Sequence, residues 1–321
     1  MRKTAALIFC VVLIFTMTAC GANSTENEAK IKVVTTIFPV YDWIRNIAAG
    51  VDEVETVMLI DSGVDLHSFQ PTAKDILEIT SSDMFVFVGG ESDEWVESAL
   101  TEGTNKDLIA INLLDKLGDN RYEEELKEGM HGEEEEEEET EEAEYDEHIW
   151  LSLKNAKILC EAICEGLSKA DESNENAYKA NLEVYLGKLD ALDKEYADAV
   201  AAGSKKTLLF GDRFPFRYLT EDYGLDYFAA FIGCSAESEA SFKTIKFLAD
   251  KTDELGLDAI IKIDGSDGKL ADTIKQNTKD KNAKILTLNS MQSITANEVN
   301  EGTTYLKIFE DNLEVLKEAI K

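Results

Sequence analysis

The stretch that decides the fold is "DESNENAYKANLEVYLGKLDALDKEYADAVAA", residues 171–202 of a chain of 321 residues. It contains no proline, and its apolar residues recur at close to the 3.6-residue period of an α-helix. Gly203 follows directly, where the C-terminal cap of a helix is expected. We therefore predict one long helix over residues 171–203. The apolar positions that define it are Ala177, Ala180, Leu182, Tyr185, Leu189, Leu192 and Tyr196.

Strand-like and helix-like segments alternate on both sides of this helix. β-branched or apolar runs such as "IKVVTTI" (31–37) and "KTLLFG" (206–211) are followed by amphipathic stretches. That alternation predicts parallel strands covered by helices on both faces. We therefore predict an α/β protein of two similar lobes with mainly parallel sheets, at residues 31–170 and 204–321, joined by the long helix. A ligand cleft is expected between the lobes, near the carboxyl ends of the strands.

The N-terminus has the pattern of an export signal. Arg2 and Lys3 precede the apolar run "TAALIFCVVLIFTM", and small residues stand directly before Cys20. A transmembrane anchor is the alternative, but the run is shorter than the about 20 residues that span a bilayer. We predict a signal peptide at residues 1–19, lipid attachment at Cys20 and a flexible tether over residues 20–30. The protein is then held at the outer face of the cell membrane.

Charge and cysteine content restrict the partners. A formal net charge of -33 repels nucleic acid and anionic lipid and attracts cations, so we expect no nucleic-acid partner. Cys160 and Cys164 are four residues apart on one face of a predicted helix, where the geometry rarely suits a disulfide. Buried free thiols are the main interpretation, and a pair of thiolate metal ligands is the alternative. No pattern suggests an oligomer, so we expect a monomer.

Two of the three histidines stand where site loops are expected. His67 lies between a predicted strand and a predicted helix, and His148 lies between an acidic run and a helix. His131 lies in the acidic run itself. An isolated histidine is more often structural than a ligand, but two at such junctions of one lobe favour a metal site. Imidazole is the commonest nitrogen ligand of divalent transition metals.

Three stretches resemble a known family. "VVTTIFPVYDWIRNIAAG", "GVDLHSFQPTAKDI" and "DEHIWLSLKNAKIL" are similar to the zinc- and manganese-binding lipoproteins of bacterial ABC importers, the cluster A-I solute-binding proteins. The resemblance runs from about Lys30 to the final helix. It implies metal ligands at His67, in the pattern G-x-D-x-H-x-x-x-P, and at His148, in the pattern D-x-H-x-W. It also implies that the protein captures a divalent metal, is not an enzyme and delivers the metal to an ABC transporter permease.

The C-terminal lobe departs from the pattern of this family. The resemblance implies a third ligand, histidine or glutamate, after the first strand of this lobe, where Asp212 and Arg213 stand. We predict Asp212 as that ligand, with a helix cap or turn residue as the alternative. Arg213 cannot bind a cation, so we expect it to turn away or to pair with a carboxylate. The fourth ligand falls on Asn289, which offers only a carbonyl oxygen and could leave the position to water. Two nearby glutamates, Glu237 and Glu239, are interpreted mainly as helix-start residues. The alternative is that they contact the metal ligands without binding the ion.

Residues 123–147 form an acidic insert with seven consecutive glutamates. Zinc-binding members of the family that the chain resembles tend to carry a histidine- and acid-rich insert at this place. Carboxylates bind divalent cations weakly, so we predict a loop that concentrates cations, with His131 as a weak accessory ligand. A merely solvated run of charge is the alternative.

The donor set decides which metal is expected. Two imidazoles and one carboxylate suit Zn²⁺, and the same set widened by an amide oxygen or water could hold Mn²⁺ or Fe²⁺. A catalytic zinc site of a metallohydrolase also has three protein ligands and is the rival function. That reaction needs a general base and an oxyanion stabiliser, for which the sequence provides no candidate beyond His131.

Overall fold

The N-terminal lobe is built on a parallel sheet. The computed structural model describes residues 31–103, 105–130, 144–235 and 239–321, so the predictions for the signal peptide, Cys20, the tether, His131 and Glu237 lie outside the described residues. Each pair of neighbouring strands in this sheet is parallel, in the order β2-β1-β3-β4. The strands are β1 (Ile31–Thr35), β2 (Val54–Met58), β3 (Met84–Phe87) and β4 (Ile109–Asn112).

The C-terminal lobe repeats this arrangement. Its parallel sheet has the order β6-β5-β7-β8, so the first strand of each lobe has the second strand on one side and the third on the other. Parallel sheets with this order leave a crevice at the carboxyl ends of the two inner strands. The prediction of two similar α/β lobes is therefore confirmed. The strands are β5 (Thr207–Phe214), β6 (Asp226–Ile232), β7 (Ala259–Ile263) and β8 (Lys284–Leu288).

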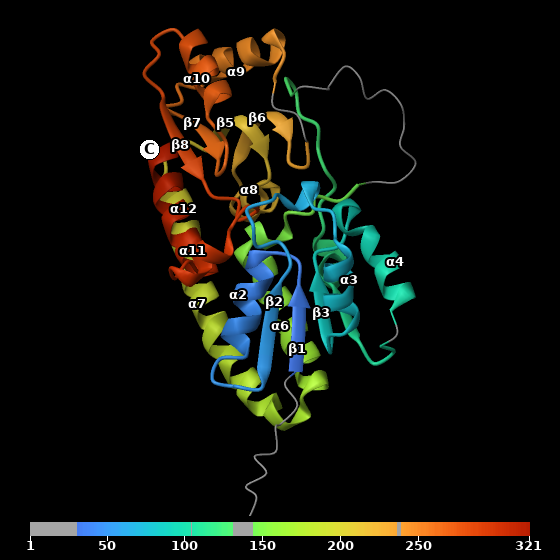
Figure 1. Cartoon of the computed structure of the whole chain (residues 1–321). Coiled ribbons are helices and arrows are strands. Elements are labelled where there is room, and N and C mark those ends of the chain that lie inside the picture. The colour runs from blue at the N-terminus through green and yellow to red at the C-terminus, as the bar shows by residue number, and fades with distance from the viewer. Residues whose placement is uncertain (1–30, 104, 131–143, 236–238) are drawn as a thin grey trace, which may run out of the picture. The chain divides into compact units, whose positions relative to one another are not determined.

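Helices cover the sheets, as Figure 1 shows. In the N-terminal lobe they are α2 (Phe38–Ile47), α3 (Ala73–Thr80), α4 (Trp95–Glu102), α5 (Leu113–Lys116) and α6 (Leu153–Ala170). In the C-terminal lobe they are α8 (Arg217–Tyr223), α9 (Phe242–Glu254), α10 (Lys269–Asn277), α11 (Ala296–Asn300) and α12 (Tyr305–Ala319). Cys160 and Cys164 on α6 are buried free thiols, as predicted. No helix in the described part of the chain combines the length and the apolar character needed to cross a bilayer.

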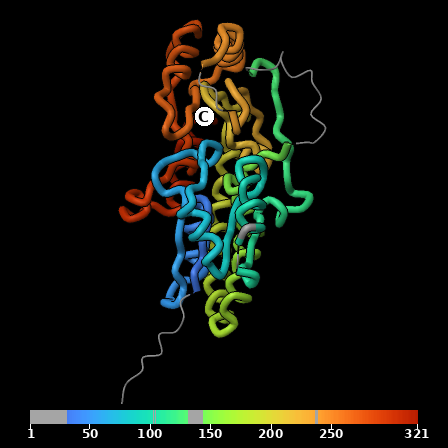
Figure 2. Tube along the Cα trace, turned by 45° about the vertical axis from the view of Figure 1, so that its right-hand side comes forward, coloured from blue at the N-terminus to red at the C-terminus, as the bar shows by residue number. Residues whose placement is uncertain are grey.

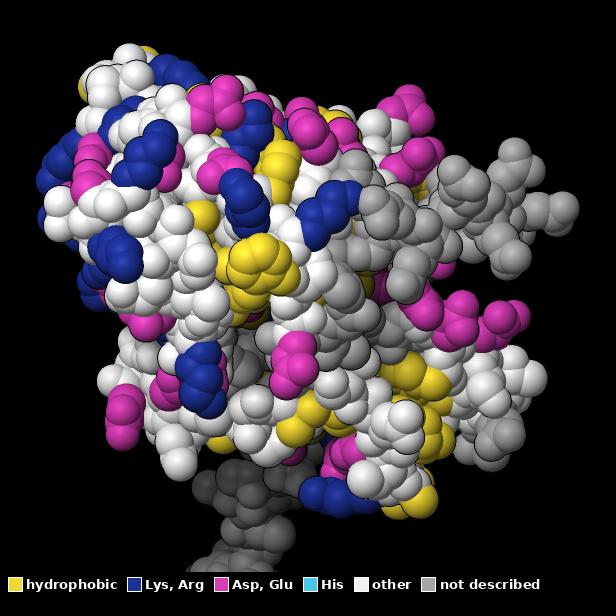
Figure 3. Space-filling model, turned by 90° about the horizontal axis from the view of Figure 1, so that it is seen from above, with side chains coloured by type: hydrophobic (Ala, Val, Ile, Leu, Met, Phe, Trp, Pro, Cys, Tyr) yellow, Lys and Arg dark blue, Asp and Glu magenta, His cyan; other side chains and the backbone are white. Residues whose placement is uncertain are grey.

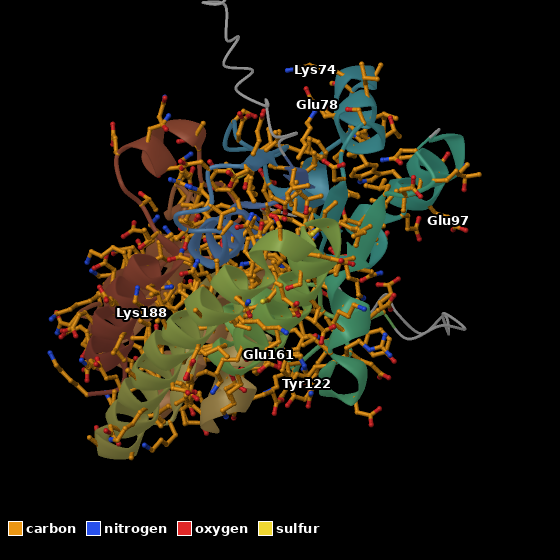
Figure 4. All side chains as sticks on the ribbon, turned by 90° about the horizontal axis from the view of Figure 1, so that it is seen from below. Lys74, Glu78, Glu97, Tyr122, Glu161 and Lys188 are labelled. Carbon is orange, nitrogen blue, oxygen red and sulfur yellow. The ribbon has the colours of Figure 1, made fainter. Side chains whose placement is uncertain are left out.

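The long helix, α7 (Glu175–Ala202), has 28 residues and therefore extends about 42 Å. It packs against α2 and α6 of the N-terminal lobe and against α8 and α12 of the C-terminal lobe. Figure 2 shows it running alongside both lobes, and Figure 4 shows Glu161 of α6 and Lys188 of α7, both exposed, on the face seen from below. The buried stripe of α7 is Tyr178, Tyr185, Leu189, Leu192, Tyr196 and Val200. The predicted connection by one helix is confirmed.

The described parts of the acidic insert are packed rather than loose. Glu123 and Tyr145 form an isolated antiparallel bridge, which brings the two ends of the insert together. Lys127 pairs with Asp226 at 2.7 Å, and Glu125 pairs with Arg217. The predicted loop of residues 123–147 is therefore fixed to the C-terminal lobe at its base.

A buried carboxylate links α2 to α12, the last helix of the chain. Asp42 on α2 accepts a hydrogen bond from the backbone N of Tyr305, at the start of α12, at 3.1 Å. Asn46 donates to the same carboxylate at 3.2 Å. Burial disfavours the charged form and raises the pKa of Asp42 from 3.8 to about 6. The folded protein therefore retains a proton here that the unfolded chain releases near pH 4.

We expect Asp42→Asn to flatten the dependence of stability on pH. Because the folded-state pKa is raised, the wild-type free energy of unfolding falls as pH rises from about 4 to about 6, by at most about 3 kcal/mol. The amide removes this loss, and its oxygen can still accept from Tyr305. Urea unfolding at about pH 4 and about pH 8 measures the difference. Parallel pH profiles for the two proteins would contradict the assignment.

Candidate metal centre

His67 is placed by a short capped turn at the carboxyl end of the N-terminal sheet. Asp65 precedes a 3-10 turn at Leu66–Ser68, and its Oδ1 accepts a hydrogen bond from the backbone N of His67 at 3.1 Å. The loop is also held from the C-terminal lobe, because Ser62 forms an isolated bridge with Thr295. His67 therefore stands on a capped turn, in a loop that the Ser62–Thr295 bridge fastens to the C-terminal lobe.

His148 is fully buried at the start of a second 3-10 turn, Ile149–Leu151. Asp146 Oδ1 accepts hydrogen bonds from its backbone N at 2.8 Å and from its ring Nδ1 at 2.9 Å. A carboxylate at Nδ1 holds the ring proton there, so the lone pair of Nε2 is free to face the centre of the molecule. The next aromatic residue, Trp150, donates from Nε1 to the backbone O of Ser290 at 2.8 Å and so fastens this turn to the C-terminal lobe.

The two imidazoles converge. Nε2 of His67 lies 3.1 Å from Nε2 of His148, and the ring centroids are 5.1 Å apart. Two nitrogens bound to one tetrahedral zinc ion, each at 2.0–2.1 Å, are separated by about 3.3 Å. The observed separation is close to that value. Figure 3 shows no histidine among the described side chains on the face seen from above, which agrees with the burial of the pair.

The surroundings shift the pKa values of the two rings in opposite directions. Burial and the nearby His148 lower the pKa of His67 to about 3. Burial also disfavours a charge on His148, but the carboxylate of Asp146 and those of Glu124 and Glu147 outweigh it and raise the pKa of His148. Near neutral pH the pair therefore carries at most one positive charge, that is, one proton beyond the single N–H of each neutral ring. A divalent cation can replace that proton between the two nitrogens.

Hydrogen-bond acceptors also lie close to Nδ1 of His67, the ring nitrogen that does not face His148. Its Nδ1 lies 2.8 Å from Ser92 Oγ and 3.5 Å from Glu147 Oε2. Glu147 is 2% exposed, and its Oε1 accepts from the backbone N of Ser92 at 2.8 Å. Both acceptors favour a proton on Nδ1 of His67, which again leaves Nε2 available as a donor to a metal.

Cys234 completes the group of candidate ligands, and we did not predict it. The ligand atoms of His67, His148 and Cys234 all lie within 4.8 Å of one another, which makes them a candidate metal-binding group among the described residues. Cys234 follows the carboxyl end of β6, directly after Gly233. A Cβ on Gly233 would come within 2.9 Å of the His148 ring, so only glycine allows this approach. Burial, together with the charge of Glu124, raises the pKa of the Cys234 thiol, so the thiol stays protonated until a cation displaces the proton.

Gln292 is the second residue that sequence reasoning missed. Its Nε2 lies 3.0 Å from His148 Nε2, and its Oε1 is buried without a hydrogen-bond partner. Met291, directly before it, has a φ of 62°, and this left-handed turn aims Gln292 at the histidine pair. Rotating the amide by half a turn exchanges its nitrogen and oxygen, which would place the oxygen where it can face a cation.

Asn289, predicted as the fourth ligand, bonds to the backbone of the turn that follows it. Its Oδ1 accepts from the backbone N of Met291 at 2.8 Å, and its backbone is paired with Asn312. A short asparagine side chain readily bonds to the backbone two residues further on. The side chain that reaches the histidines comes three residues later along the chain. As a ligand, Asn289 stays a prediction, and no described contact joins it to the histidine nitrogens.

Asp212, predicted as the third ligand, also bonds to the backbone. Its Oδ2 accepts from the N of Ile263 at 3.3 Å and its Oδ1 from the N of Arg213 at 2.9 Å. It lines a cleft of about 950 Å³ rather than the group formed by the histidines and Cys234. As a ligand it likewise stays a prediction. Arg213 pairs with a carboxylate, one of the two arrangements that we expected, because its Nη2 donates to Asp65 Oδ2 at 2.8 Å.

Comparison with known proteins gives the family. Residues 33–319 match the family described as zinc-uptake complex component A, periplasmic. The chain belongs to this family. The match covers both lobes of the zinc-uptake component A fold and the helix that joins them, and the predicted resemblance to metal-binding solute-binding proteins is confirmed.

Two curated members of the zinc-uptake component A family are similar along the whole chain. The zinc-binding lipoprotein AdcA of Streptococcus pneumoniae serotype 4 is 30% identical over 319 residues, which are 99% of this chain and 61% of that protein. The chain thus spans about three fifths of the length of the AdcA relatives. The high-affinity zinc uptake system protein ZnuA of Bacillus subtilis is 30% identical over 327 residues, with 99% of this chain and 98% of that protein covered. The first name describes a zinc-binding lipoprotein, and the second describes part of a zinc uptake system.

Solved structures agree with the fold. The Zn(II)-bound ZnuA-like domain of Streptococcus pneumoniae AdcA has a TM-score of 0.71 at 27% identity, with 91% of this chain and 99% of that chain covered. The Mn-bound periplasmic metal binding protein of Candidatus Liberibacter asiaticus has a TM-score of 0.73 at 21% identity, with 91% and 100% covered. The second likeness shows the fold alone. The zinc-uptake component A architecture, two parallel α/β lobes on one long helix, is therefore common to all three chains.

Proposed function

We propose that this protein captures one zinc ion outside the cytoplasmic membrane and delivers it to the permease of an ABC transporter. The observation that carries the proposal is the approach of two histidine Nε2 atoms, 3.1 Å apart, beside a half-buried cysteine at the meeting of the two lobes. The membership in the zinc-uptake component A family supports the same function, as do the relatives that are named for zinc binding and zinc uptake.

The donors that we propose are His67, His148 and Cys234, with the amide oxygen of Gln292 or a water as the fourth. Thiolate is a soft ligand that favours zinc, whereas manganese favours carboxylate, carbonyl and water. Affinity for nitrogen and sulfur sites also rises from Mn²⁺ to Zn²⁺ in the usual order of divalent metals. Manganese or iron is the alternative cargo, and it would suit a site in which Asp212 and Asn289 were ligands.

We propose the cellular location of the protein from the signal pattern before Cys20 and from a relative. The N-terminal signal pattern and Cys20 imply a lipid anchor on the extracytoplasmic face of the cell membrane. AdcA of Streptococcus pneumoniae is named a lipoprotein, which supports this inference.

Isothermal titration of the demetallated protein with Zn²⁺ and with Mn²⁺ tests this function. We expect one tight site for zinc, with an affinity at least about tenfold higher than that for manganese. Equal affinities, or tighter binding of manganese, would overturn the choice of zinc. Turnover of ester or phosphate substrates by the metal-loaded protein would overturn the transport function in favour of a metallohydrolase.

Replacing residues 131–143 with a short glycine-serine linker separates the tight site from the acidic run. The bridge between Glu123 and Tyr145 closes the base of the insert, so the lobes should fold without it. We expect the tight zinc site to keep its affinity. The weak additional zinc binding should disappear, because the carboxylates and His131 of this run bind a cation weakly and without a fixed coordination geometry. Equilibrium dialysis at high and low zinc measures both classes. Loss of the tight site would place it in the insert.

A further inference from the structure

We propose that Arg213 is a positioning residue that joins the loop of His67 to the loop of Cys234 and keeps the metal donors assembled before an ion arrives. The inference rests on the proposed function, namely that His67, His148 and Cys234 hold the ion. It assigns a role to the arginine at the position where a third metal-binding side chain was expected. Arg213 would not touch the ion and would act through its neighbours.

The contacts of Arg213 reach both loops. Its Nη2 donates to Asp65 Oδ2 at 2.8 Å, and its Nη1 donates to the backbone O of Ser235 at 3.2 Å. Asp65 in turn accepts from the backbone N of His67, and Ser235 directly follows Cys234. A planar guanidinium is rigid, so two of its donors fix the distance between the groups that they bind. One side chain on β5 thus connects an N-terminal ligand loop with a C-terminal one.

Asp65 extends the connection to a third loop. Its Oδ1 accepts the bond from His67 and also lies 3.5 Å from Gln292 Nε2, the side chain that contacts His148. The carboxylate therefore receives donors from both lobes, with His67 and Gln292 at Oδ1 and Arg213 at Oδ2. Removing Arg213 would leave Asp65 held by the His67 loop and a long contact to Gln292. The His67 loop would then lose its strongest link to the opposite lobe at this site.

The pair is exposed enough to be changed without unfolding the protein. The side chains of Arg213 and Asp65 are 21% and 20% exposed, and both line the cleft of about 950 Å³. Ion pairs in contact with solvent contribute little to global stability. Their loss should therefore alter the arrangement of the site more than the fold. Moreover, the core and the helix α7 keep the lobes together independently of this pair.

A second physical effect of Arg213 has the opposite sign. A guanidinium near a divalent cation repels it, and Arg213 neutralises the attraction that Asp65 would otherwise exert. If charge dominated, Arg213→Gln would bind zinc more tightly. If positioning dominates, as we propose, the same variant binds zinc more weakly, because the His67 loop has to be ordered when the ion binds. The direction of the change therefore decides between the two effects.

Zinc titrations of three variants test the proposal. We expect Arg213→Gln to bind zinc about tenfold more weakly, the usual effect of losing an outer partner of a metal ligand. Arg213→Lys keeps the positive charge and one hydrogen bond but cannot bind both loops at once. Its zinc affinity should therefore lie between those of the wild type and Arg213→Gln. The double variant Arg213→Gln, Asp65→Asn restores the net charge, and an asparagine can still cap the turn. Its affinity should stay low. Recovery to the wild-type value would show that the unpaired carboxylate of Asp65, and not the lost connection between the loops, weakens zinc binding, and it would overturn the proposal.

Arg45→Gln is the matched control, because Arg45 is an exposed arginine on α2 that is remote from the candidate ligands and stacks on Tyr41. We expect it to bind zinc as the wild type does. The visible absorption of the Co²⁺-loaded proteins reports the coordination geometry, and it should weaken in Arg213→Gln while the thermal midpoint of the demetallated protein changes little. Unchanged or tighter zinc binding by Arg213→Gln refutes the positioning role. If the wild type itself binds no zinc, or if His67→Ala binds as tightly as the wild type, the proposed function fails and this inference fails with it.

Discussion

Replacing His148 with alanine should lower the zinc affinity by at least about a hundredfold. Zinc binding by a structural four-ligand site contributes about 10–16 kcal/mol, so the loss of one donor removes roughly a quarter of that free energy. His148 is fully buried, with Nδ1 on Asp146 and Nε2 3.1 Å from His67 Nε2, and no other described imidazole is in this group. Water can replace the donor but not its basicity.

His67→Ala is the companion variant, because its side chain is 11% exposed and leaves a smaller cavity. It should lose zinc affinity to a similar extent, and it keeps the buried contact between His148 and Asp146. Competition with a chromophoric chelator measures the affinities, and circular dichroism with thermal unfolding checks the fold of both variants. A variant that folds and binds zinc within about threefold of the wild type would show that the imidazole is not a ligand.

Cys234→Ser is expected to have the second largest effect. The serine hydroxyl does not become an anion near neutral pH, whereas a zinc-bound cysteine loses its proton. We expect zinc affinity to fall by about tenfold to a hundredfold, and manganese affinity to change less, because thiolate is a poor donor for manganese. The preference for zinc over manganese should therefore narrow. Loss of the sulfur-to-metal charge-transfer absorption of the Co²⁺ form would identify the thiolate directly.

The matched control for Cys234→Ser is Cys164→Ala. Cys164 is a buried free thiol on α6, on the side of the N-terminal lobe that packs against α7, and it is not in the group of candidate ligands. It should cost some stability and leave the Co²⁺ spectrum unchanged. If Cys234→Ser kept the full affinity for zinc, the third donor would be elsewhere, and Asp212→Asn would be the next variant to measure.

The two histidines could be predicted because their signals are local. His67 and His148 both follow an aspartate at two residues' distance, and the structure shows that each of these aspartates accepts a bond from the histidine backbone. Such capped turns depend on neighbours in sequence. The two α/β lobes and the long helix could be predicted for the same reason, because strand and helix periods are read over short windows.

The C-terminal donors could not be predicted in this way. Cys234 becomes a candidate only because β6 ends opposite His148 and Gly233 lets the chain approach the ring. Gln292 reaches the site through the left-handed turn at Met291, whereas Asn289 has the more suggestive position in the sequence. Which of several polar residues after a strand faces the cleft is decided by how the two lobes pack. No pattern within either segment contains that information.

The unbroken course of α7 limits how an ion can leave this protein. Its tyrosines are buried against helices of both lobes. A large rotation of one lobe against the other would therefore expose aromatic rings that are now buried. Small rearrangements of the surface turns around His67 are far cheaper. Spontaneous dissociation of a captured ion should consequently be slow. The rate of release would then be set by a partner that displaces one such turn, and not by a motion of one whole lobe against the other.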